Sequence, residues 1–594
     1  MARRKSSTYK REGRTLSGPP GGPGKARPTG ERGTQWRAVV IVVAGLLIYS
    51  NSLSSPFLFD DQNSIIGNTQ IRQLWPLSIP LSPPRDTPVA GRPLVNLSFA
   101  INYAAGGLDP WGYHLGNVII HVMAALVLFG LVRRALAGAG LQTSADHATN
   151  IAFVCALLWL VHPLNSEAVN YFSQRTESMM GLFYLLTLYC AVRGPGEGGR
   201  GNQRWNTLAT LTCAAGMLCK ESMVTAPVVV MLYDRIFVFE SWKKMFRERR
   251  GFYVGLAFTW LVLAALMSST PRTSVGFDAG TSPVVYLLNQ CQMIARYLGL
   301  AIWPRDLVLD YGLPRPLAFT DVLPQAALVI ALGLATLAAL VRWPALGFFG
   351  ACVFITLAPT SSFVPIATEV GAERRMYLPL AALVVLAVTT VYRITCGAGL
   401  VRPAQASPTP GSPPRVRGGV AWLAPHVGRC RAAAAVAVCV CLLLAAGTIA
   451  RNREYASALS IARTIVDRWP SGRGHFLLGA ELLAAGQREA GMAQLRLSAA
   501  DYPGARYALG TEYLSEGRMD AAIGELDAFI GAVPRHVNVA PARDMLGRAF
   551  AAQGRFDLAT DQLERLLRDH PGYPRREEVR ALIVQLRNAR SPRS

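Results

Sequence analysis

Long apolar runs separated by short polar or basic segments recur along residues 36–450 of the chain. A helix needs about 20 mainly apolar residues to cross a bilayer, and several of these runs are slightly shorter. The pattern predicts an all-α, polytopic membrane domain over 37–450, with about eleven spans. We expect the spans at 37–50, 113–132, 150–165, 177–192, 206–219, 222–238, 252–269, 322–341, 345–358, 376–395 and 432–450.

One further apolar segment, 284–303, is ambiguous because polar side chains interrupt it. The loop 396–431 contains several Arg and no acidic residue, so the positive-inside rule favours a cytoplasmic position for it. That loop falls inside only if 284–303 lies at the interface or re-enters. The interrupting residues are Asn289, Gln290, Gln292 and Arg296.

Composition and charge fit this membrane interpretation. Only 16% of residues are charged, and the formal net charge is +23. The basic residues gather between apolar runs, so they indicate orientation rather than nucleic-acid binding. Residues 1–36 are basic and rich in Gly and Pro, which predicts a disordered cytoplasmic tail. We expect a multi-pass protein of the bacterial inner membrane, or of the endoplasmic reticulum if the source is eukaryotic.

The last part of the chain, 451–594, has the composition of a soluble protein and repeats itself. Three copies, beginning "FLLGAELLAAGQ", "YALGTEYLSEGR" and "DMLGRAFAAQGR", share a Leu-Gly pair and a later Gly at an average period near 34. They resemble tetratricopeptide repeats, which form an α-solenoid of helix pairs. With eleven spans, this domain is extracytoplasmic. It either supports the membrane domain or offers a concave surface to an acceptor protein or peptide; both interpretations stay open.

Ionisable groups beside membrane spans are costly, so they are the first candidates for function. The predicted topology places four groups of them on the external face. They are Asp60, Asp61, Arg92 and His114 in the first loop; His162, Glu167, Arg175 and Glu177 after the third span; Lys220 and Glu221 between the fifth and sixth spans; and Glu369, Glu373, Arg374, Arg375 and Tyr377 at and just after the loop 359–375.

The adjacent carboxylates of Asp60 and Asp61 point to acid–base chemistry. In an extended segment, neighbouring side chains face opposite sides, so one carboxylate suits a general base and the other an orienting group or metal ligand. Mutual repulsion, with the apolar side chains of Phe57 and Phe59 beside the pair, should raise the pKa of one of them. The alternative is a turn that caps a helix from Asn63 onward.

Two other positions have competing explanations. Lys220 suits a phosphate or an internal carboxylate such as Glu221, although a Lys–Glu pair can simply neutralise itself at the interface. His114, Asn117 and His121 share one helix face and could line a site, but interhelical hydrogen bonds are favoured for His121.

External carboxylates with Arg and Lys fit sugar transfer from a lipid-linked phosphosugar, in which a base takes the proton of a hydroxyl and cations stabilise the departing phosphate. The sequence lacks a Walker loop, a Gly-x-Ser-x-Gly motif, a His-Glu-x-x-His motif and a Cys/His cluster. No cofactor is certain, and a divalent metal ion is a candidate only.

Five segments, "PFLFDDQNSIIGN", "RPLVNLSFAINYAAGGLDPWGYHLGNVIIHV", "HPLNSEAVNYFSQRTESMMGLFYLL", "CKESMVTAPVVVMLYD" and "GAERRMYLPLAAL", occur in the order found in the transmembrane and tetratricopeptide repeat O-mannosyltransferases. The chain resembles this family, and more broadly the GT-C glycosyltransferases. The resemblance implies a polyprenyl-phosphate sugar donor, with mannose expected, and inverting transfer to Ser or Thr of a protein.

The resemblance also suggests roles for individual residues. Asp60 and Asp61 match the acidic motif of the first external loop and are the expected catalytic residues. The repeat array is short, and the His-Pro and Ala-Glu-Arg segments match in their central letters only. The residues expected to bind donor phosphate or substrate are Arg92, His114, His162, Glu167, Arg175, Lys220, Glu221, Glu373 and Arg374.

Two other functional classes compete with a transferase. In a non-catalytic membrane scaffold, the repeats would organise an envelope or glycan-assembly complex. A transporter of lipid-linked sugar would place its ionisable groups near the middle of the bilayer, whereas here they crowd at one face. The sequence therefore favours the transferase.

Overall fold

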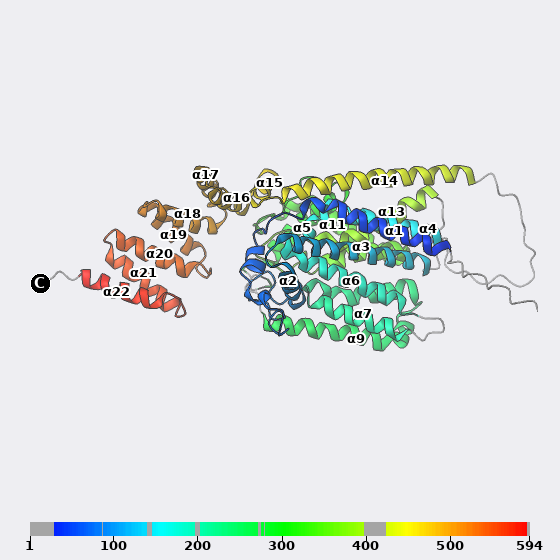
Figure 1. Cartoon of the computed structure of the whole chain (residues 1–594), viewed down its shortest axis with the longest axis horizontal. Coiled ribbons are helices and arrows are strands. Elements are labelled where there is room, and N and C mark those ends of the chain that lie inside the picture. Colours follow the sequence, from blue (N-terminus) through cyan, green and yellow to red (C-terminus); the bar gives the residue numbers. More distant parts are fainter. Residues whose placement is uncertain are drawn as a thin grey trace, which may run out of the picture.

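The computed structural model describes residues 29–85, 87–138, 145–195, 202–270, 275–277, 280–396 and 423–590. Within these ranges every regular element is a helix, apart from one isolated bridge between Val275 and Ile366. Long helices form a bundle, and a chain of shorter helices continues from one end of it (Figure 1). The all-α prediction is confirmed. Of the predicted tail, residues 1–28 lie outside the described residues, and 29–36 already belong to the first helix.

Each predicted span coincides with a helix. The segment 222–238 is a short helix extended at both ends by η6 (Glu221–Thr225) and η7 (Asp234–Val238). The helices are α1 (Thr29–Ile48), α3 (Pro110–Gly138), α4 (Ala145–Leu160), α6 (Arg175–Arg193), α7 (Gln203–Met217), α8 (Ala226–Tyr233), α9 (Trp242–Ser269), α11 (Leu323–Arg342), α12 (Pro344–Leu357), α13 (Tyr377–Cys396) and α14 (Leu423–Glu454).

Length and composition support a multi-pass membrane protein. Among the described helices, 5 are long and apolar enough to cross a membrane, and a bent pair raises the number to 6. That pair joins Asp146–Leu160 to Pro163–Asn170 at an angle of 56°. Pro163 lacks the N–H that a continuous helix would need, which accounts for the break. The count of eleven spans stays a prediction.

Polar side chains join helices inside the bundle. His121 on α3 is fully buried and contacts the Tyr377 hydroxyl on α13 at 2.9 Å and the Leu160 carbonyl on α4 at 3.1 Å. The bond from Trp159 Nε1 to the Tyr377 carbonyl, 2.9 Å long, ties α4 to α13 again. His121 therefore makes the interhelical hydrogen bonds that the sequence favoured.

The ambiguous segment 284–303 forms α10 (Pro283–Ile302), which is not among the described helices apolar enough to span. Its polar side chains bond to loop backbone: Asn289 Nδ2 donates to Arg315 O at 2.8 Å, and Gln290 Nε2 donates to Val370 O at 2.8 Å. These loops precede α11 and α13, so α10 packs against the loops at one end of the bundle. Whether α10 crosses the membrane stays a prediction.

The carboxy-terminal helices form successive pairs. Each copy of the repeat gives two helices joined at a glycine with positive φ: Gly486 (76°), Gly517 (73°) and Gly554 (74°). Pro503 begins the first helix of the second copy, where its missing N–H costs nothing. The elements are α15 (Ala458–Arg468), α16 (Gly472–Ala484), α17 (Arg488–Ser498), α18 (Pro503–Ser515), α19 (Met519–Ala532), α20 (Val539–Ala552), α21 (Phe556–Asp569) and α22 (Arg576–Arg590).

Candidate active site

Asp61 fastens the first external loop to the bundle. Its side chain is fully buried, its Oδ2 accepts the Leu58 N–H at 3.0 Å, and its Oδ1 accepts the Ser173 N–H at 2.7 Å. Burial raises the pKa of Asp61 to about 7, while the two backbone donors oppose that rise. Both carboxylate oxygens are therefore occupied by main-chain donors.

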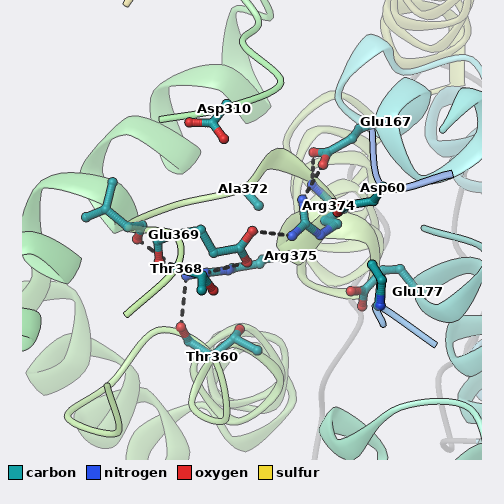
Figure 2. Close-up of polar contacts among 12 residues, drawn as sticks. Asp60, Glu167, Glu177, Asp310, Thr360, Thr368, Glu369, Ala372, Arg374 and Arg375 are labelled. Carbon is teal, nitrogen blue, oxygen red and sulfur yellow. Dashed lines mark hydrogen bonds and ion pairs between the residues drawn. The ribbon is translucent and has the colours of Figure 1, made fainter. Parts of the chain in front are cut away.

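Asp60, its neighbour, is partly exposed and faces a cluster of charges (Figure 2). The Tyr171 hydroxyl accepts the Asp60 N–H at 2.9 Å. Phe59, directly before it, has φ 36°, a left-handed conformation that costs a non-glycine residue about 1–3 kcal/mol. Burial raises the pKa of Asp60, and the guanidinium groups of Arg473 and Arg374 act against that rise.

Burial is the main cause of the raised pKa at both carboxylates. The sequence predicts that mutual repulsion beside Phe57 and Phe59 raises the pKa of one of them, and burial is the largest cause at both residues. The charge of Asp60 affects the pKa of Asp61 less than burial and the backbone donors do. The two side chains occupy different environments, so they interact only weakly.

Arg374 lies at the centre of the charge cluster, held by two acidic residues. Glu167, on α5 (Ser166–Asn170), accepts from Arg374 Nη1 at 2.5 Å and from the Arg374 N–H at 2.8 Å. Glu369 accepts from Arg374 Nη2 and, at 2.9 Å, from Arg375 Nη2. Although burial acts to raise it, Arg374 and Arg375 hold the pKa of Glu369 well below its usual range. Figure 2 shows Arg374 between these carboxylates, next to Asp60.

Two further ion pairs border the cluster. Lys220 is buried and pairs with Glu177, not with Glu221 as the sequence suggested. Glu221 instead pairs with Arg92 at 3.3 Å, which links the segment after α7 to the start of α2 (Pro93–Gly106). Burial lowers the pKa of Lys220, Glu177 opposes this, and Arg374 lowers it further. Lys220 therefore shares the electrostatic environment of Arg374.

Four other predicted site residues hold neighbouring segments together. His114 Nε2 contacts Ser55 O at 3.1 Å, and His162 contacts Leu164 N and Ala301 O, both at 3.2 Å. Glu373 accepts from Val308 N at 2.5 Å and from the Tyr311 hydroxyl at 3.0 Å.

The fourth, Arg175, is almost fully buried. Its Nε donates to Asn117 Oδ1 at 2.6 Å, its Nη1 to Asn102 Oδ1 at 2.6 Å, and its Nη2 to Tyr113 O at 2.8 Å. These acceptors belong to α2 and α3, so Arg175 fixes the packing of α6 against them.

Sequence reasoning did not include Tyr171 and Arg473 among the candidate residues, and it listed Glu369 among the charged groups without assigning it a role. Glu369 lies in the external loop 359–375, four residues before Glu373. Arg473 is on α16, inside the repeat region, and its sequence context "SGRGHF" gives no sign of a site. Only the folded chain brings it near Asp60.

The described residues do not fit a divalent metal ion. Among them, no group of three or more His, Cys, Asp or Glu side chains is arranged to hold one. Asp61, one of the two carboxylates considered as an orienting group or metal ligand, accepts backbone N–H donors at both oxygens. Its carboxylate therefore serves the loop backbone rather than a metal ion.

The chain is 34% identical over 300 residues to protein O-mannosyl-transferase tmtc2 of Xenopus laevis, a match that covers 45% of this chain and 34% of the relative. Over this segment, the chain is similar to the TMTC proteins. It is also 30% identical over 299 residues to Tmtc1 of Drosophila melanogaster, covering 45% of this chain and 33% of that protein. The chain thus spans about a third of the length of the curated relatives it matches.

The other comparisons add less. No protein-family model matches the chain. Among solved structures, ArnT from Cupriavidus metallidurans bound to undecaprenyl phosphate aligns over 90% of this chain and 80% of its own, with a TM-score of 0.39 and 14% identity.

Proposed function

We propose that this protein is a membrane glycosyltransferase. It moves a sugar, with mannose expected, from a polyprenyl-phosphate donor to Ser or Thr of a protein outside the cytoplasm. The observation that carries the proposal is the partly exposed Asp60 carboxylate beside the Arg374 guanidinium at one end of an apolar bundle. The names of the TMTC relatives, protein O-mannosyl-transferases, support the same reaction class.

The reaction assigns separate tasks to the acid and the cations. Asp60 takes the proton of the acceptor hydroxyl as its oxygen bonds to the anomeric carbon of the sugar. The bond from that carbon to the phosphate oxygen breaks on the opposite side, which inverts the configuration. The polyprenyl phosphate leaves with the bonding electrons, and Arg374 and Lys220 stabilise its negative charge.

The different environments of the two carboxylates assign their roles. Asp60 is the proposed general base because its carboxylate faces the charge cluster, and its raised pKa brings it closer to neutral pH. Asp61 is a positioning residue because its oxygens hold Leu58 and Ser173 in place. The strained φ of Phe59 directs the loop so that Asp60 faces the cluster.

The test measures transfer of radiolabelled mannose from polyprenyl-phosphate mannose to candidate acceptor proteins in membranes containing the full chain. Asp60→Asn should lower kcat by roughly 10²- to 10⁴-fold, the usual contribution of a general base. Asp61→Asn should lower both the rate and the thermal stability because it disturbs the loop. Asp109→Asn, an exposed Asp on the segment joining α2 to α3, is the matched control and should transfer normally.

Two outcomes would contradict the proposal. Full activity of Asp60→Asn would remove Asp60 as the base while leaving the reaction class in place. Absence of transfer by the wild type with every sugar donor and acceptor tested would favour the non-catalytic scaffold.

A further inference from the structure

The first helices of the repeat region are docked against the loops of the membrane bundle. Arg468 Nη1 donates to Leu307 O at 2.8 Å. Trp469 Nε1 donates to Tyr311 O at 3.1 Å, and the two aromatic rings lie 5.2 Å apart, edge to face. The partners lie in the loop between α10 and α11, so helix α15 and the turn after it are anchored to the bundle (Figure 1).

The approach at this interface is close. Gly312 has φ 81°, and a Cβ added there would lie 3.1 Å from Ser471 Cβ, directly before α16. A larger residue would be strained by both its backbone conformation and this contact. The two segments therefore pack as one unit, with no space for an independent hinge at this point.

The same helices contact the loop that carries the proposed base. Ala462 on α15 and Leu478 and Leu482 on α16 form a small buried cluster, and Phe59 packs against it. Phe59 directly precedes Asp60 and is held in its left-handed conformation. The repeat region thus helps to fix the backbone from which the Asp60 side chain extends.

Arg473 on α16 connects three segments at this edge. Its Nε lies 3.1 Å from Asp310 Oδ2, and its Nη1 donates to Thr368 O. Thr368 precedes Glu369, which holds Arg374. The Arg473 side chain is 27% exposed, so it lies at the rim of the cluster. Its positive charge acts on Asp60 together with that of Arg374.

We infer that the first helices of the repeat array complete the active site, with Arg473 as a positioning residue for Asp60 and for the segment that holds Arg374. The inference rests on the proposed function, and it adds that the repeats are part of the catalytic unit rather than a tethered arm. An acceptor that follows the repeats would reach the base directly where α16 meets the bundle.

The charges around Asp60 give the inference a specific signature. Arg473, Arg374 and the Tyr171 hydroxyl favour the ionised carboxylate, whereas burial and the charge of Glu369 oppose it. Removing the Arg473 charge raises the pKa of Asp60 further. The base works only when ionised, so the acidic limb of kcat/KM against pH must move to higher pH.

The test compares wild type, Arg473→Gln, Arg473→Lys and Arg506→Gln in the mannose-transfer assay between pH 5 and 8. Arg473→Gln should lose on the order of tenfold in kcat/KM on the acidic side of the profile, the size of coupling seen within one network of ion pairs and hydrogen bonds, and less at higher pH. Arg473→Lys keeps the charge and should retain the wild-type limb. Arg506, paired with Glu525 at 3.1 Å within the repeats and 34% exposed, is the matched control.

Thermal unfolding of each variant shows whether the protein remains folded. If Arg473→Gln is unstable, Arg473→Lys and Asp310→Asn replace it. Both variants keep a cation at position 473. They should therefore keep the acidic limb of kcat/KM at the wild-type pH while lowering the rate. If the wild type is active and the acidic limb of Arg473→Gln lies at the same pH as that of the wild type, the inference is wrong and the proposed function is unaffected. A wild type without any transfer overturns both.

Discussion

At the scale of single residues, the candidate site shows how neighbours in sequence acquire different tasks. Asp61 is enclosed by main-chain donors, and Asp60 faces cations. A carboxylate already satisfied by two N–H groups is poorly placed to take a proton from a substrate, because substrate would have to displace those donors. Of two adjacent acidic residues, one can thus anchor the loop while the other acts as the proposed base.

Glu167 provides a test of how precisely Arg374 must be held. Glu167→Gln removes the charge and leaves one oxygen to accept where two now bind the Arg374 side chain and N–H. We expect kcat to fall roughly 10- to 100-fold because misplacement of a stabilising cation by about 1 Å has that effect. Steady-state mannose transfer measures it.

The matched control for Glu167 is Glu525→Gln. Glu525 lies in the repeat region, where it pairs with Arg506 at 3.1 Å, and its side chain is 26% exposed. Exposed pairs contribute little, so this variant should stay within a few-fold of wild type. Equal losses in the two variants would show that Arg374 does not depend specifically on Glu167.

The sequence identified many residues of this site, but not the contacts that these residues make. It placed Lys220 among the functional residues and suggested Glu221 as a partner, whereas Glu177 on α6 forms the ion pair. Pairing across 43 residues depends on how α6 packs beside α7. Periodicity along one helix holds no information about its neighbour, so this partner could not be predicted.

At the scale of elements, the long helices were predictable because each apolar run must be buried or lie in lipid. Short helices could not be predicted in this way. The sequence assigned residues 51–112 to an external loop without predicting α2, whose 14 residues begin with a proline. Short polar-flanked helices depend on tertiary contacts more than on pattern.

The repeated Leu-Gly pair was predictable together with its physical reason. A Cβ at Gly510 would lie 2.7 Å from Leu526 Cγ on the paired helix α19, and Gly479 and Gly547 are similarly crowded by Leu495 and Leu563. Small residues were expected where the helices touch, and the close contacts confirm this.

Gly510→Ala should therefore destabilise the α18–α19 pair by about 1–3 kcal/mol, the usual cost of overpacking. Hydrogen exchange of the α18 and α19 backbone in the full chain measures the local opening, which should become faster. The control is Gly524→Ala in α19, where no atom lies within 4 Å of the added Cβ. This change should slow exchange because Ala favours the helix by about 0.5–1 kcal/mol. Slower exchange in Gly510→Ala would contradict the packing argument.

At the scale of the whole molecule, the contacts place the external loops and the repeats at one end of the bundle. The Asp61 bond to Ser173, the Glu167 pair with Arg374 and the Arg473 pair with Asp310 connect segments far apart in the chain. The repeats extend from the end at which α2 lies (Figure 1). The grouping of four charged segments on one side was predicted by counting spans, and these contacts agree with it.

The same contacts bear on whether α10 crosses the membrane. If it crossed, the loops before α11 and α13 would lie on the cytoplasmic side, away from Asp60. Instead, Arg374 pairs with Glu167, and Arg473 joins Asp310 to Thr368.

A reporter enzyme that is active only outside the cytoplasm should therefore be active when fused after Ser594 and inactive when inserted within 397–422. The inverse pattern would require either that α10 spans or that the whole bundle has the opposite orientation. A third fusion, in the first external loop after Asp109, separates these cases: it stays active if only α10 was misassigned and becomes inactive if the orientation of the entire protein is reversed.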